Sequence, residues 1–134
     1  MGKIISRLGI RIYYEDTDAG GVVYYANYLR YMERARTEFL LDRGIDVADY
    51  HDKGYLFAVV HVDVHYRKPA RLGEMIEVTT EVTDMTNVTM TLRHQIFKDA
   101  ALLVDATVKL ACINKDGKPQ RLPAEFSQLL TESR

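Results

Sequence analysis

A single long helical pattern near the N-terminus constrains the fold of this chain more than any other feature. Apolar residues recur there at steps of three and four residues, as they do on one face of an α-helix. They are Tyr28, Tyr31, Met32, Ala35 and Phe39. The charged residues of the same stretch lie mostly off this face; they are Arg30, Glu33, Arg34, Arg36 and Glu38. Gly44 ends the pattern, because glycine tolerates the positive φ at which helices commonly end. We predict a helix from about Ala26 to Arg43 whose apolar face packs against another element.

Apolar and polar residues alternate along much of the remaining chain, with the period of two that is typical of β-strands. The first such segment runs from Leu8 to Tyr14, before the helix. Four more follow the helix, at residues 57–66, 76–83, 88–96 and 104–112. Short links between the later strands favour antiparallel pairing. The sequence therefore predicts an α+β fold in which one sheet packs on one helix, with a helical turn at Val47 to Tyr50 and a short helix between Pro123 and Glu132.

Composition is typical of a soluble globular protein. The 134 residues suffice for a single domain, residues 1–134, and 47% are hydrophobic while 28% are charged. No apolar run is long enough to cross a membrane, and Met1 to Arg7 lack the apolar core of a signal peptide, so we expect a cytoplasmic protein. The net charge of −1 gives no electrostatic reason to expect a nucleic-acid partner. The single cysteine, Cys112, excludes an internal disulfide and a cysteine-based zinc cluster.

A carboxylate-rich turn lies directly before the predicted helix. Asp16, Thr17 and Asp18 precede Gly20 and Gly21. The first N–H groups of a helix have no intrahelical partner, and the helix dipole adds partial positive charge beside them. An acid next to such donors is suited to acyl transfer, which needs a base or nucleophile beside groups that hold an oxyanion. Spacing alone favours the alternative, a purely structural turn in which these residues only make capping hydrogen bonds.

The turn also carries a resemblance to a known family. The segment Tyr14 to Tyr28, YEDTDAGGVVYYANY, resembles the signature of the hotdog-fold acyl-CoA thioesterases, and the later segment Tyr66 to Gly73, YRKPARLG, resembles a strand-ending segment of the same group. The similarity is to the 4-hydroxybenzoyl-CoA thioesterase-like superfamily and, within it, the Tol-Pal-associated YbgC-type branch. It implies a hotdog fold, an antiparallel sheet of about five strands wrapped around one long central helix, and an acyl-CoA thioesterase.

The resemblance also implies catalytic roles. Asp18 matches the catalytic carboxylate of such enzymes, which either attacks the thioester to give a mixed anhydride or deprotonates a water. The backbone N–H of Tyr25 matches the donor that polarises the thioester carbonyl. Many YbgC-type members have histidine where this chain has Tyr25, a departure that leaves the backbone role intact. For Tyr14 three roles stay open: it orients Asp18, it lines the pocket, or it packs at a strand end.

Assembly follows from the same resemblance. Hotdog proteins usually pair two sheets edge to edge, with the acyl-CoA tunnel at the dimer interface, so we expect a homodimer or a homotetramer. The strand 57–66 of one subunit would then approach Asp18 of the other. The expected substrate-binding residues are Val59, Val60, His61 and Tyr28. The basic residues Arg67, Lys68 and Arg71 either bind the phosphates of CoA or form a solvated strand end.

A different function class stays open: a non-catalytic scaffold of the same fold that binds an acyl carrier protein or a lipid thioester. The acid at Asp18 favours hydrolysis, because a scaffold has no need of it, and dehydratases of this fold typically depend on a histidine. We expect no cofactor and no metal, since His61 and His65 share a strand face but have no clear third ligand. His94 lies in the apolar register of its strand, which favours a hydrogen-bonded core histidine.

Overall fold

The protein, seen in a computed structural model that describes residues 5–130, is built on one sheet and one long helix. In chain order the elements are β1 (Ser6–Arg11), the 3-10 helix η1 (Tyr14–Asp16), α1 (Asn27–Asp42), α2 (Val47–Asp52), β2 (Leu56–Tyr66), β3 (Met75–Met85), β4 (Thr89–Lys98), β5 (Ala101–Ile113) and α3 (Phe126–Leu130). Residues 131 and 132 of the predicted C-terminal helix, and Met1 to Ile4 of the N-terminal segment, lie outside the described residues.

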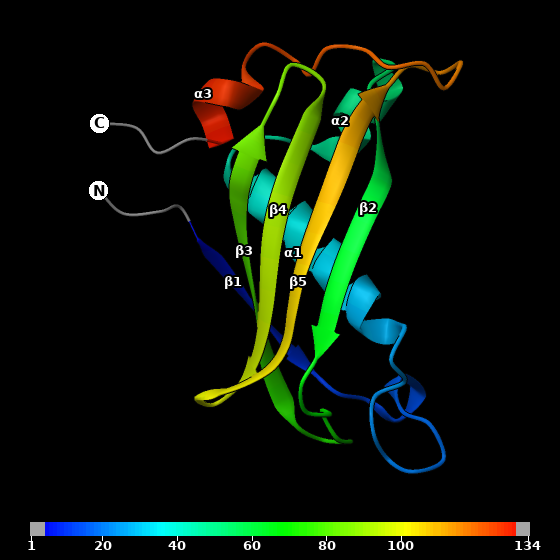
Figure 1. Cartoon of the computed structure of the whole chain (residues 1–134), viewed down its shortest axis with the longest axis vertical. Coiled ribbons are helices and arrows are strands. Elements are labelled where there is room, and N and C mark those ends of the chain that lie inside the picture. The colour runs from blue at the N-terminus through cyan, green and yellow to red at the C-terminus, as the bar shows by residue number, and fades with distance from the viewer. Residues whose placement is uncertain (1–4, 131–134) are drawn as a thin grey trace.

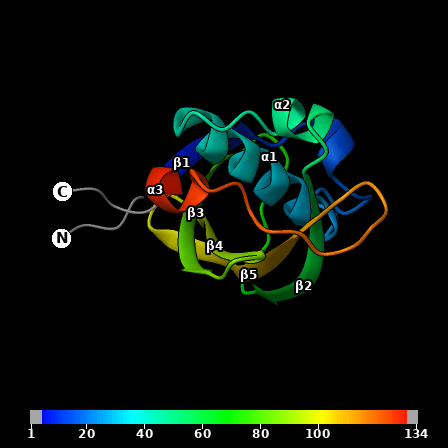
Figure 2. The ribbon, with the colours of Figure 1, turned by 90° about the horizontal axis from the view of Figure 1, so that it is seen from above.

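The five strands form an antiparallel sheet in the order β1-β3-β4-β5-β2. Helix α1 runs along one face of this sheet (Figure 1), and the view from above shows the strands curving beneath it (Figure 2). The predicted fold class, a sheet of five strands wrapped around a central helix, is confirmed. Among the strands of residues 5–130, β1 and β2 each pair with a single neighbour, so they form the two edges of this sheet.

The first strand ends earlier than the sequence pattern indicates. Ile12 still pairs with the start of β3, since its N–H donates to the Glu74 carbonyl at 2.9 Å. The next amide, of Tyr13, donates instead to the Asp16 carboxylate at 2.7 Å, which turns the chain away from the sheet. Tyr14 therefore lies in η1, and the prediction that it ends a strand is wrong.

The core lies between α1 and the sheet. The predicted apolar face of α1 is buried, and Gly44 follows the helix with φ of 83°. Arg36 is also buried, with 8% of its surface exposed, so its prediction as a residue off this face is wrong. Arg36 follows Met32 by one helical turn and therefore lies on the same face of α1. There its Nη1 lies 3.2 Å from Nε2 of His94 on β4, which gives the buried guanidinium an acceptor.

His94 is the hydrogen-bonded core histidine that its register predicts. Its ring is fully buried, and Nδ1 lies 3.1 Å from the Thr80 hydroxyl and 3.3 Å from the Thr79 carbonyl. Burial and the neighbouring Arg36 guanidinium lower the pKa of His94 to about 3. Among residues 5–130, none of the helices combines the length and the apolar character needed to cross a membrane.

Candidate active site

Asp18 lies at the tip of a tight hairpin between η1 and α1. Its backbone N–H donates to the Val22 carbonyl at 3.0 Å, and Gly21 N–H donates to its carbonyl at 3.0 Å. Gly21 has φ of 77°, a conformation that glycine adopts without the steric cost of a Cβ atom. One carboxylate oxygen, Oδ1, accepts a hydrogen bond from Gly20 N–H at 2.9 Å. The side chain is exposed, and within residues 5–130 its second oxygen has no hydrogen-bond partner.

The amide of Tyr25 lies at the start of α1. Asn27 is the first residue of the helix, and Asn27 N–H donates to the Tyr24 carbonyl at 2.8 Å. Ala26, the N-cap residue, provides no side-chain cap. In the described part of the chain, the Tyr25 N–H donates to no protein acceptor. An unpaired donor at the positive end of the helix dipole is therefore available to an oxyanion.

Three tyrosines surround this helix start. The Tyr66 hydroxyl, at the end of β2, donates to the Tyr25 carbonyl at 3.3 Å, and the two rings meet edge to face with centroids 6.3 Å apart. The Tyr28 ring lies 5.7 Å from that of Tyr66, and its hydroxyl accepts from the Ala70 N–H at 2.9 Å. Burial raises the pKa of both Tyr28 and Tyr66. The cluster fixes the end of β2 against the start of α1, as Figure 1 shows for the two elements.

A cavity of about 230 Å³ opens beside this cluster. It is lined by Val23, Tyr25, Tyr28, Tyr66, Arg67, Lys68 and Pro69. Its wall is thus aromatic, while two cationic side chains lie along it. Tyr66 was not among the residues predicted for the site, although it begins the second segment that carries the family resemblance. Nothing in the sequence indicates that the end of β2 meets the start of α1.

The remaining predicted site residues come from η1, directly before the hairpin, and from the edge strand β2. Tyr14 is 82% exposed in η1, and its carbonyl accepts from the Thr17 hydroxyl at 2.8 Å. Val59, Val60 and His61 lie on the edge strand β2, where the pairing with β5 is irregular between Val59 and His61. Val59 lines two small cavities, of about 180 and 100 Å³, between β2 and the middle of α1. A single chain therefore does not bring these three residues to the Asp18 hairpin.

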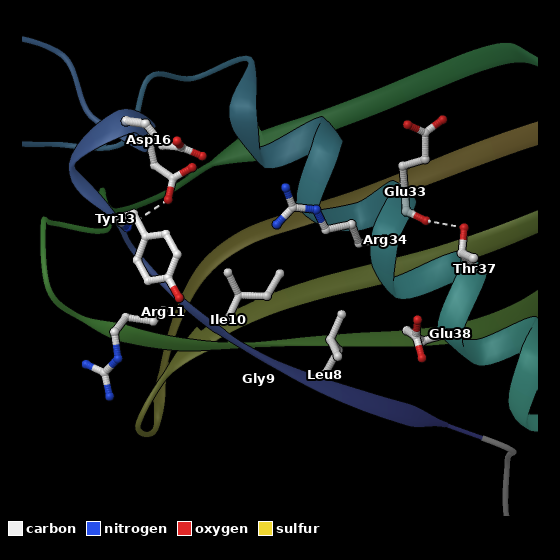
Figure 3. A pocket seen from close by; sticks show the side chains of 11 residues that line it. Leu8, Gly9, Ile10, Arg11, Tyr13, Asp16, Glu33, Arg34, Thr37 and Glu38 are labelled. Carbon is white, nitrogen blue, oxygen red and sulfur yellow. Dashed lines mark hydrogen bonds between the residues drawn. The ribbon is translucent and has the colours of Figure 1, made fainter.

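A larger hollow of about 660 Å³ lies on the opposite flank of α1, between this helix, β1 and η1 (Figure 3). Its lining includes both acids and bases, among them Arg11, Glu15, Arg34 and Glu38. Neither Asp18 nor the Tyr25 amide lines it, so the candidate chemistry lies elsewhere. Within residues 5–130, no group of three or more His, Cys, Asp or Glu side chains is arranged to hold a metal ion.

Fold and site together define a hotdog-type protein with an acidic hairpin at the start of its central helix. A family model described as the Thioesterase-like superfamily matches residues 13–130. The chain is 39% identical over 134 aligned residues to the Acyl-CoA thioester hydrolase YbgC of Escherichia coli O6:H1, covering 96% of this chain and 100% of the relative. It is 38% identical to the Acyl-CoA thioesterase YbgC of Haemophilus influenzae, covering 87% of each.

Solved structures agree with this assignment. The crystal structure of a probable thioesterase from Bartonella henselae superposes with a TM-score of 0.84 at 33% identity, covering 90% of this chain and 100% of that one. This chain belongs to the thioesterase-like superfamily. The resemblance to YbgC-type thioesterases inferred from the two sequence segments is confirmed.

Proposed function

We propose that the protein hydrolyses an acyl-CoA thioester to the free acid and CoA. Two observations within residues 5–130 support this proposal: Asp18 has a carboxylate oxygen without a hydrogen-bond partner, and the Tyr25 N–H at the start of α1 donates to no protein acceptor. The names of the relatives, which are acyl-CoA thioesterases and thioester hydrolases, support the same reaction. No cofactor enters the proposed chemistry.

In the proposed reaction, the thioester carbonyl oxygen accepts a hydrogen bond from the Tyr25 N–H. This donor and the dipole of α1 stabilise the negative charge that grows on the oxygen in the transition state. Asp18 acts in one of two ways: its carboxylate attacks the carbonyl carbon to give a mixed anhydride, which water then cleaves, or it takes a proton from an attacking water. In both cases the tetrahedral adduct expels the CoA thiolate, which takes up a proton.

The cavity beside Tyr25 is the proposed entry for the substrate. Its aromatic wall of Tyr25, Tyr28 and Tyr66 suits the thioester and the first atoms of the acyl group. Arg67 and Lys68 supply positive charge for the phosphates of CoA. Tyr14, exposed next to the hairpin, is proposed to contact the substrate or to orient Asp18 once the substrate covers it.

The edge strand β2 supports the proposed assembly. Val59, Val60 and Val62 on this strand are 48%, 55% and 39% exposed, and the strand is 11 residues long. A long, apolar, exposed edge is a template for pairing with another strand. Pairing of β2 with its copy in a second subunit would cover these side chains and place Val59, Val60 and His61 near the partner's hairpin. The proposed assembly is a homodimer or a homotetramer built from two such dimers, located in the cytoplasm.

The test is thiol release from short, long and aromatic acyl-CoAs by the wild type, Asp18→Asn and Asp52→Asn. Asp52 is an exposed acid at the end of α2 and serves as the matched control. We expect the wild type and the control to hydrolyse the same substrates, and Asp18→Asn to be slower by about 100- to 10,000-fold. Equal rates for a folded Asp18→Asn would refute the mechanism. If the wild type hydrolyses none of them, the alternative of a scaffold or an acyl-carrier-protein substrate takes its place.

A further inference from the structure

Asn27 joins the Asp18 hairpin to the start of α1. Its side-chain amide, Nδ2, donates to the carbonyl of Asp16 at 2.9 Å in a partly buried position. The same carbonyl oxygen accepts the Tyr24 N–H at 3.0 Å. Thr17 and Val23 pair as an isolated antiparallel bridge just inside this junction. The hairpin is therefore closed at its base and tied to the helix through one carbonyl oxygen.

The backbone of Asn27 fixes the orientation of the proposed oxyanion donor. Asn27 N–H donates to the Tyr24 carbonyl at 2.8 Å, and no peptide bond in the described residues is cis. The Tyr24 carbonyl and the Tyr25 N–H belong to one planar trans peptide group, so they point in opposite directions. Because the carbonyl points at the first turn of α1, the Tyr25 N–H points away from it. Accepting a hydrogen bond also polarises the peptide group, which strengthens its N–H as a donor.

The side chain of Asn27 contributes little to the helix itself. Its acceptor is a carbonyl upstream of the helix, and it satisfies none of the unpaired N–H groups of the first turn. Such a bond instead fixes how two segments lie relative to each other. Asp18 is two residues from Asp16, and Tyr25 is one residue from Tyr24, so both reacting groups are attached directly to the junction.

We propose that Asn27 is a positioning residue, which holds the Asp18 carboxylate and the Tyr25 N–H at the separation that the reaction requires. The inference rests on the proposed function. Displacement of a reacting group by about 1 Å costs about 100-fold in rate, so loss of this single tie has a measurable effect on the chemical step. Substrate affinity depends instead on the cavity and its cations, which Asn27 does not line.

The test compares Asn27→Ala with Asn27→Asp. Alanine keeps the backbone bond to Tyr24 and has the higher helix propensity, so only the side-chain tie is lost. Aspartate keeps the shape but cannot donate, and it places a carboxylate oxygen against the Asp16 carbonyl oxygen. We expect kcat to fall by about 10- to 100-fold in both variants and KM to change by less than about threefold, while Asn27→Ala remains folded at the assay temperature.

Thr37→Ala is the matched control, because Thr37 also bonds a carbonyl, that of Glu33 at 3.1 Å, on an exposed part of α1. It is expected to keep the wild-type kcat. A kcat within twofold of wild type in Asn27→Ala would overturn the inference, as would a loss that matches a lowered melting temperature in both Asn27 variants. Asp18→Asn is measured in the same series. If Asp18→Asn is impaired and Asn27→Ala is not, only the positioning role fails. If Asp18→Asn keeps the wild-type rate, the proposed mechanism fails and this role with it, and if the wild type hydrolyses no acyl-CoA, the proposed function fails.

Discussion

Acid is expected to destabilise this protein through His94. The ring is fully buried, and its Nε2 lies 3.2 Å from Arg36 Nη1. A guanidinium only donates, so Nε2 must be the unprotonated acceptor, and Nδ1 carries the proton that is directed at Thr79 and Thr80. Protonation of Nε2 would break this bond and place two positive charges side by side in the core.

The size of the effect follows from the two pKa values. His94 in the folded protein has a pKa of about 3, against 6.5 for an ordinary histidine. Between these values the unfolded chain binds one more proton than the folded one, so stability is lost as the pH falls below the unfolded pKa. Lowering the pH from 7.5 to 5.0 should remove roughly 2 kcal/mol of unfolding free energy through this residue alone. Most of the loss occurs below pH 6.5.

The assay is urea unfolding of the wild type and His94→Gln at pH 7.5 and 5.0, at one protein concentration. Glutamine keeps an oxygen to accept from Arg36 and an amide to donate, but does not titrate. The carboxylates of the protein titrate in both proteins, so their contribution cancels in the comparison. We expect the wild type to lose roughly 2 kcal/mol more than the variant over this interval. An equal loss in both proteins would refute the reasoning.

Three substitutions and one labelling experiment test other parts of the structure. Tyr28→Phe removes the acceptor of the buried Ala70 N–H and should lower the free energy of unfolding in urea by about 1–3 kcal/mol; an unchanged midpoint would contradict this. Gly21→Ala forces alanine to φ of 77° and should cost about 1–2 kcal/mol in the same assay, whereas equal stability would mean that the turn relaxes freely. Val60→Lys puts a charge on the exposed edge of β2 and should shift sedimentation toward the monomer, with no shift if β2 is not the interface. Burial raises the pKa of the Cys112 thiol, so it should react with a disulfide reagent only after unfolding; rapid reaction of the native protein would argue against a buried site.

Local patterns predicted the elements but not their order in the sheet. The stripe on α1 and the end of the helix at Gly44 depend on contacts within a few residues, so periodicity and a single glycine were sufficient. The alternation along the strands was equally visible. The sequence does not indicate which strands are neighbours in the sheet. β1 pairs with β3 and β2 pairs with β5, and no local signal distinguishes these pairings from others.

Arg36 shows why polarity alone misplaces a residue. The sequence assigns a charged side chain to the solvent face, yet helical geometry puts Arg36 one turn from Met32, on the buried face. Its burial is possible because His94, 58 residues away, offers a neutral acceptor. This hydrogen bond between Arg36 and His94 is a tertiary contact, and a helical sequence pattern does not predict such contacts.

The candidate site also combines residues that a local sequence pattern indicates with residues that only tertiary contacts bring together. Asp18 and Tyr25 could be predicted because both belong to one short segment that carries the family resemblance. Tyr66 and the cavity beside it could not, since they exist only where the end of β2 reaches the start of α1. The side-chain tie from Asn27 to Asp16 spans 11 residues and also requires the folded hairpin.

The proposed chemistry and its specificity therefore depend on different contacts. The proposed carboxylate, the oxyanion donor and the Asn27 side-chain bond all lie between residues 16 and 27 and are held by hydrogen bonds of 2.8–3.0 Å, so changes in this segment should act on kcat for every substrate. The proposed acyl surroundings come from β2, which follows α1 and α2 in the chain, and from a second subunit. Substitutions at Val59 leave the hairpin and its bonds untouched, and they are expected to change which acyl groups are accepted rather than how the thioester is broken.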